Sequence, residues 1–102
     1  MSDERRSSER KTVNLVVKWD SLSGSYEAKL EDISLSGCFI NTTGLANLDE
    51  VMNLEVLLPS GKWLPLKGTV TTYQQGIGFG VIFSSLTDEQ TQAVEKLCRD
   101  FH

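Results

Sequence analysis

Residues 12–31 read TVNLVVKWDSLSGSYEAKLE, and this stretch decides the class of fold. Apolar and polar side chains alternate along its first half, which is the period of a β-strand with one buried face. The apolar members of this first half are Val13, Leu15, Val17 and Trp19. Residues 20–24 are rich in turn formers, and the alternation then resumes at Tyr26, Ala28 and Leu30. The pattern predicts a β-hairpin with one face in a core.

The period of two continues through most of the chain beyond this hairpin. A short apolar run at residues 38–40 precedes a polar loop at residues 41–50. Later alternating positions, which we expect to face inward, are Met52, Leu54, Val56, Leu58, Ile77, Phe79, Val81 and Phe83. Between them lies a long strand, residues 63–73, in which Pro65 predicts a sheet edge or a bulge because proline cannot donate to a ladder. About six strands with short connections predict an antiparallel meander or small barrel.

The period changes only near the end of the chain. Residues 87–90 read Thr-Asp-Glu-Gln, which fits a capping box, and the two acids suit the positive end of a helix dipole. The apolar residues that follow at helical spacing are Val94, Leu97, Cys98 and Phe101. We therefore expect a C-terminal helix at about residues 87–101, with this stripe against the barrel.

Composition limits the chain to one soluble domain. It has 102 residues, of which 39% are hydrophobic, and a net charge of −4. No stretch approaches the roughly 18 apolar residues of a membrane span, and the polar start lacks the apolar middle of a secretion signal, so we expect a cytoplasmic protein. The two cysteines and the single terminal histidine predict buried thiols, with neither a disulfide nor a metal site.

Residues 1–11 form the only linker-like segment and are expected to be a flexible N-terminal arm. Residues 5–11 hold four basic side chains against one acidic side chain, although the chain as a whole is acidic. Arg5, Arg6 and Arg10 matter most, because a guanidinium can grip a phosphate, fork onto the O6 and N7 of guanine, or stack on a base. The segment is either a site for a small anion or a solvated polar tail.

Asp32, Ser34 and Gly37 follow the second predicted strand. A carboxylate can accept hydrogen bonds from the N1 and N2 hydrogens of guanine, and a hydroxyl can bond a base edge or a phosphate oxygen. Gly37 would permit a bend or a close approach of the backbone. Alternatively, the segment is only an Asx-turn that leaves the strand, with Gly37 at a positive φ. The local residues leave both interpretations open.

Taken together, Arg6-x-x-x-Arg10 and Asp32-x-Ser34-x-x-Gly37 resemble the paired signature of the PilZ domain family, whose members bind the bacterial second messenger cyclic di-GMP. Residues 76–83, GIGFGVIF, are similar to a glycine-containing strand common near the end of these domains. The order of the elements also matches, so the resemblance covers nearly the whole chain. We interpret the glycines of this strand as packing residues, because no helix begins after them as in a phosphate loop.

The resemblance implies a fold and a binding site. The fold would be a mainly β, six-stranded antiparallel β-barrel with a C-terminal helix (residues 12–102) and an N-terminal arm that wraps over cyclic di-GMP. Arg6 and Arg10 would bind guanine edges and phosphates, and Asp32, Ser34 and Gly37 would line the opposite wall. Arg5 precedes the first motif arginine, which in this family tends to accompany an intercalated pair of ligand molecules. Cyclic di-GMP would be a ligand, and no cofactor is expected.

The resemblance thus implies a receptor for cyclic di-GMP that couples ordering of its arm to an unidentified downstream protein, in the regulation of motility or biofilm formation. The alternative is a PilZ-like protein interaction module that binds no nucleotide. We do not expect an enzyme, because no nucleophile-base-acid set is legible and no histidine lies in the body of the chain. A barrel that binds single-stranded nucleic acid is disfavoured by the acidic net charge.

Overall fold

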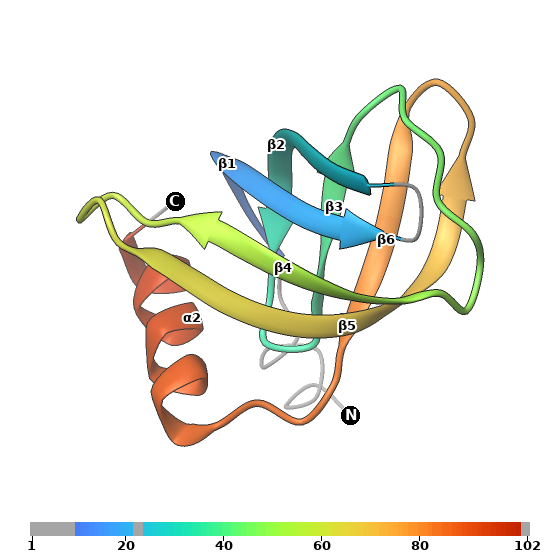
Figure 1. Cartoon of the computed structure of the whole chain (residues 1–102). Helices are drawn as coiled ribbons and strands as arrows, with labels where there is room; N and C mark the ends of the chain where they lie inside the picture. The colour runs from blue at the N-terminus through green and yellow to red at the C-terminus, as the bar shows by residue number, and fades with distance from the viewer. Residues whose placement is uncertain (1–9, 22–23, 101–102) are drawn as a thin grey trace.

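The computed structural model of the chain describes residues 10–21 and 24–100. Six strands and one helix occur among these residues (Figure 1). The elements, in chain order, are β1 (Lys11–Ser21), β2 (Gly24–Ile33), β3 (Gly37–Asn41), β4 (Val51–Leu57), β5 (Trp63–Gln74), β6 (Gly78–Phe83) and α2 (Asp88–Asp100).

The strands form a closed barrel in the order β1-β2-β3-β6-β5-β4, and every neighbouring pair is antiparallel. The first hairpin pairs Ser21 with Gly24 at its tip, as the turn residues there predicted. Pairing of β1 with β4, in which Val17 lies opposite Val56, closes the sheet on itself. The predicted six-stranded antiparallel barrel with a C-terminal helix is confirmed.

The barrel interior is filled by the inward-facing members of each alternating pattern. These buried side chains include Val13, Val17, Trp19, Leu30, Met52, Leu54, Val56, Phe79 and Val81. The Trp19 ring packs edge-on against Phe79, with ring centroids 5.3 Å apart. Two inward predictions were wrong. Tyr26 of β2 is 39% exposed. Ile77 is 52% exposed, because it lies in the turn before β6 rather than in the strand.

Pro65 lies in the first part of β5, which pairs with β4 on one side but not with β6 on the other. Pairing of β5 with β6 begins only at Gly68, so among the described strands β4 alone lies beside Pro65. The predicted edge is therefore confirmed, and a missing N–H at such an edge leaves no donor unsatisfied. The side chain of Gln90 covers the Pro65 carbonyl oxygen, to which its Nε2 donates a hydrogen bond of 2.8 Å.

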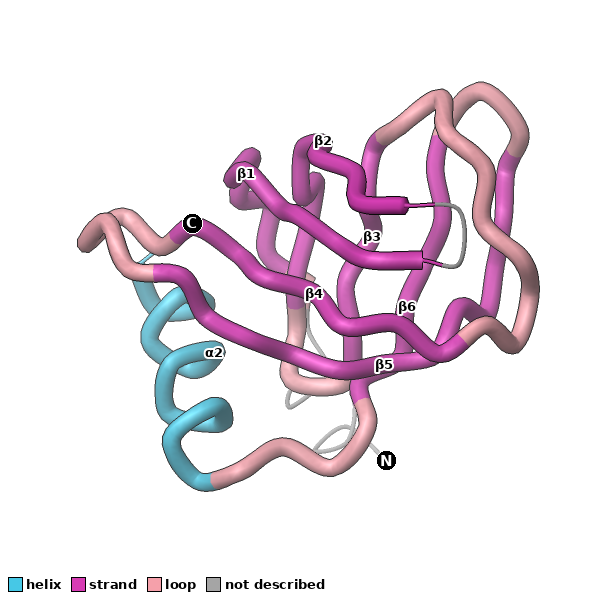
Figure 2. The backbone as a smooth tube through the Cα atoms, in the orientation of Figure 1, coloured by secondary structure: helices cyan, strands magenta, loops and turns pink. Residues whose placement is uncertain are grey.

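Helix α2 begins with the predicted capping box. The Gln90 N–H donates to the Thr87 hydroxyl at 3.1 Å, and the Thr87 N–H donates to the Gln90 Oε1 at 2.8 Å. Its inner face buries Val94 and Leu97, and Figure 2 shows the helix packed beside β5. Within the described part of the chain, no helix has the length and apolar character that crossing a membrane would require.

Candidate functional site

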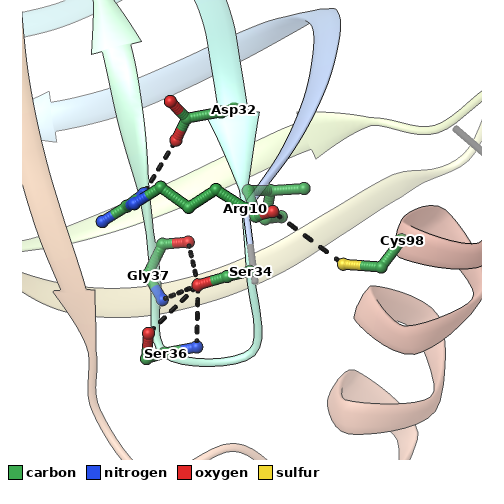
Figure 3. A network of polar contacts seen from close by, with 7 residues as sticks. Arg10, Asp32, Ser34, Ser36, Gly37 and Cys98 are labelled. Carbon is green, nitrogen blue, oxygen red and sulfur yellow. Dashed lines mark hydrogen bonds and ion pairs between the residues drawn. The ribbon is translucent and has the colours of Figure 1, made fainter. Parts of the chain in front are cut away.

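An ion pair joins the two polar segments that the sequence singled out. The Arg10 Nη1 lies 2.7 Å from the Asp32 Oδ1, although the two residues are 22 positions apart. Pairing of Thr12 with Asp32 in the β1–β2 ladder brings the start of β1 beside the end of β2. Both side chains of the ion pair drawn in Figure 3 are partly exposed, at 46% and 21%, so the pair is accessible to a ligand.

A register shift in β2 determines the direction of the Asp32 side chain. The period of two would place Asp32 on the same face as Leu30, which is fully buried. An irregularity in the pairing with β3 falls between Leu30 and Asp32, and Ile33 rather than Asp32 becomes the next buried residue. An extra residue in one strand of a pair reverses the face of the side chains that follow it. The carboxylate therefore lies on the outer face of the barrel.

Ser34 organises the turn between β2 and β3. Its hydroxyl oxygen accepts hydrogen bonds from the backbone N–H groups of Ser36, at 3.2 Å, and Gly37, at 3.3 Å. Its own N–H donates to the Gly37 carbonyl oxygen at 2.8 Å, and the residue is 0% exposed. The turn is thus held by a serine hydroxyl rather than by the carboxylate of Asp32, and the Asx-turn interpretation was wrong (Figure 3).

Gly37 is required because two strands approach closely at this position. A Cβ placed on Gly37 would overlap the carbonyl oxygen of Val81 in β6. The described residues with a positive φ do not include Gly37, so conformational freedom is not the reason for the glycine. Of the two roles open at the sequence level, the structure supports close approach.

Arg5 and Arg6 lie outside the described residues, as does most of the expected arm. The arm was predicted to extend through Lys11, but Lys11 is the first residue of β1 and pairs with Ile33. Arg10 directly precedes this strand and is held by its ion pair. The structure therefore brings together Arg10 and Asp32, and the turn held by Ser34 follows Asp32 at the end of β2.

Phe39 is a neighbour of the site that the sequence analysis missed. It lies opposite Asp32 in the β2–β3 ladder and is half-buried, whereas Cys38 and Ile40 on either side are fully buried. The sequence could have predicted the outward direction of Phe39, because side chains alternate along a strand and residues 38 and 40 face inward. Its position beside Asp32 depends on the register shift in β2, which no local pattern reveals.

Two cysteines lie near the site, Cys38 in β3 and Cys98 in α2. Burial raises the pKa of the Cys38 thiol from 9.0 to about 12, the nearby Asp32 carboxylate adds to this effect, and Arg10 partly offsets it. Cys98 of α2 places its Sγ 3.9 Å from the Ile33 carbonyl oxygen, so the last turns of the helix contact the end of β2. The prediction of two buried thiols is therefore confirmed for Cys38 and wrong for Cys98, which is only half-buried.

Solved structures show the same fold in proteins of dissimilar sequence. The inhibitor of motility MotI/DgrA of Bacillus subtilis aligns over 94% of this chain and 50% of its own, with a TM-score of 0.79 and 18% identity. The PilZ domain of CeSA from a cellulose-synthesizing bacterium aligns over 91% and 97%, with a TM-score of 0.72 and 21% identity. The complex of K. pneumonia MrkH with c-di-GMP aligns over 94% and 52%, with a TM-score of 0.77 and 17% identity.

The chain spans about half the length of MotI/DgrA and of MrkH. No curated protein matches the sequence significantly. The family model described as the PilZ domain matches residues 4–100, which include both arginines of the first motif and the whole of the second. The chain therefore belongs to the PilZ domain family.

Proposed function

We propose that this protein is a receptor for cyclic di-GMP, and that Arg10 and Asp32 are its central ligand-binding residues. The observation that carries the proposal is their 2.7 Å ion pair, which joins the two motifs of a PilZ domain on an exposed face of the barrel. PilZ domains are regulatory binding modules, and members of the family bind cyclic di-GMP as a ligand. Its bases and phosphates match what this pair can bind.

The ligand would separate the ion pair and give each charged side chain a new partner. Guanine offers its N1 and N2 hydrogens to the Asp32 carboxylate, while the Arg10 guanidinium binds a phosphate or the O6 and N7 of a base. Neither charge would lose its partner in the exchange, which matters because an unpaired, desolvated charge is costly. Ser34 and Gly37 form the wall behind Asp32 and maintain its shape.

Residues 1–9 supply the remainder of the proposed site. Arg5 and Arg6 would close over the ligand from the side opposite Asp32, and ordering of this arm would be read by an unidentified downstream protein. The cost of ordering a segment lowers the affinity but makes binding itself a switch. Arg5 supports an intercalated pair of ligand molecules, so we expect a stoichiometry of two per chain.

Isothermal titration calorimetry tests the proposal on the wild type, Arg10→Ala and Asp32→Asn. We expect the wild type to bind cyclic di-GMP but neither GTP nor a short oligonucleotide, with two ligands per chain. Because each forked or base-edge contact contributes roughly 1–3 kcal/mol, each variant should bind about 10- to 100-fold more weakly. Lys62→Ala is the matched control, since it removes an exposed cation from the β4–β5 turn, away from the site (Figure 1).

A folded wild type that does not bind cyclic di-GMP would contradict the receptor function and favour a domain that binds only a protein. Binding of one ligand per chain would contradict the intercalated pair but leave the receptor intact. Equal weakening by Lys62→Ala and Arg10→Ala would show that only net charge matters, and would remove the assignment of Arg10.

A further inference from the structure

A row of side chains runs outward from Asp32 across four strands of the barrel. Asp32 of β2 lies opposite Phe39 of β3, Phe39 lies opposite Gly80 of β6, and Gly80 lies opposite Thr72 of β5. Residues directly opposite in antiparallel strands project from the same face, with Cβ atoms about 5 Å apart. The Phe39 side chain therefore stands beside the Asp32 carboxylate on the outer face.

The Phe39 ring lies along β6 over two glycines. A Cβ built on Gly80 would be 3.8 Å from the Phe39 Cδ1, and one built on Gly78 would be 2.9 Å from the Phe39 Cε2. Cδ1 and Cε2 are opposite corners of the ring, so the ring spans both glycines. A side chain at Gly78 would compete with the ring for the same space. The two glycines thus leave a flat surface on β6, here called the glycine bed, on which the Phe39 ring lies.

Part of the surface around the ring is apolar and exposed. Phe39 itself is half-buried, so part of the ring faces solvent. In the adjacent row, Ile82 is 44% exposed and lies opposite Gly37, which has no side chain to cover it. An aromatic ring and an isoleucine on the outside of a small barrel, beside an exposed ion pair, form a surface suited to a planar ring that carries hydrogen-bond donors at its edge.

We propose that Phe39 is a stacking surface for a guanine base of cyclic di-GMP, with the Watson–Crick edge of that base directed at Asp32. This assignment rests on the proposed receptor function and adds a ligand-binding residue that lies outside both motifs. Stacking on an aromatic ring is tolerant of the base, whereas the carboxylate selects for the N1 and N2 donors of guanine. Phe39 would therefore contribute affinity, and Asp32 would contribute selectivity.

Calorimetric titration of Phe39→Leu, Phe39→Tyr and the wild type tests the assignment. Phe39→Leu keeps an apolar side chain on the glycine bed, so the barrel should fold, but it removes the aromatic face. Because base stacking is worth roughly 1–3 kcal/mol, we expect Phe39→Leu to bind cyclic di-GMP about 10- to 100-fold more weakly, and Phe39→Tyr to stay within about threefold of the wild type. Ile77→Ala, which removes an exposed apolar side chain at the β5–β6 turn, should bind as the wild type does.

Proton NMR of the wild type gives a readout that needs no substitution. A base stacked on the ring should shift the Phe39 ring protons upfield at saturating ligand. If the wild type binds and Arg10→Ala does not, while Phe39→Leu binds normally and the ring protons do not move, the stacking assignment is wrong and the receptor function stands. If the wild type does not bind at all, the receptor function itself fails, and the assignment with it.

Discussion

Gly37 shows how a motif residue can act through the backbone rather than through chemistry. Its main chain passes so close to the Val81 carbonyl of β6 that no side chain fits. The same residue also ends the turn held by Ser34, through the hydrogen bond from its N–H to the serine hydroxyl. The glycine thereby fixes the distance between β3 and β6, the two strands that carry Phe39 and its glycine bed.

We predict that Gly37→Ala destabilises the barrel. The added methyl group would have to push β3 away from β6, and overpacking of this kind costs roughly 1–3 kcal/mol. The free energy of unfolding in urea measures the change. Gly44→Ala is the control, since its Cβ would meet only the Thr42 hydroxyl oxygen, at 3.3 Å. Equal stability of the two variants would show that the strands separate without cost.

At the scale of elements, Gln90 links the start of α2 to the free edge of β5. Its Oε1 accepts from the Thr87 N–H inside the capping box, while its Nε2 donates to the Pro65 carbonyl oxygen. One side chain thus satisfies a helix terminus and a strand edge, both of which would otherwise depend on water. The helix that this contact anchors also contacts the end of β2 through Cys98.

We predict that Gln90→Ala costs more stability than Thr87→Ala. Loss of the cap in Thr87→Ala should lower the free energy of unfolding by about 1 kcal/mol. Gln90→Ala loses the reciprocal bond of the cap and the bond to β5 together, and should lower it by roughly 1–2 kcal/mol. Thermal and urea unfolding measure both variants. Gln92→Ala, on the exposed face of the same helix, should be neutral or slightly stabilising. A Gln90→Ala protein as stable as Gln92→Ala would rule out the proposed link.

At the scale of the whole molecule, closure of the barrel controls the chemistry of its interior. Cys38 lies fully buried on β3, and burial raises the pKa of its thiol to about 12. The unfolded chain exposes the same thiol, whose ordinary pKa is 9.0. Between these two values the thiol is ionised in the unfolded chain and protonated in the barrel, so rising pH favours unfolding.

We predict that the contribution of Cys38 to stability is complete below pH 9 and is lost as the pH rises toward 12. The slope of this contribution approaches about 1.4 kcal/mol per pH unit. Because other groups also titrate there, the informative quantity is the difference in unfolding free energy between the wild type and Cys38→Ala, measured in urea from pH 8 upward under reducing conditions. This difference should change as the pH rises from 9 toward 12. Parallel profiles for the wild type and Cys38→Ala would contradict the prediction.

Much of the architecture was readable from local patterns. The hairpin of β1 and β2, the inward residues of β4 and the cap at Thr87 all follow from periods and turn residues within a few positions of one another. The edge at Pro65 followed from the chemistry of one residue. Ile77 was wrongly predicted to face inward, because it fits the alternating pattern of β6 although the strand begins only at the next residue. The pattern alone does not show where strand pairing begins.

The sequence by itself determined the number of strands, the position of the helix and the two motifs, because side-chain period, turn chemistry and capping are local properties. Only the tertiary structure decided that Arg10 meets Asp32, that Asp32 faces outward, and that Phe39 stands beside it. These relations depend on the pairing of strands distant in sequence and on two register shifts, one between Thr12 and Leu15 and one between Leu30 and Asp32. A single extra residue in a ladder reverses the face of every side chain after it, and its position follows from packing of the closed barrel rather than from the local pattern.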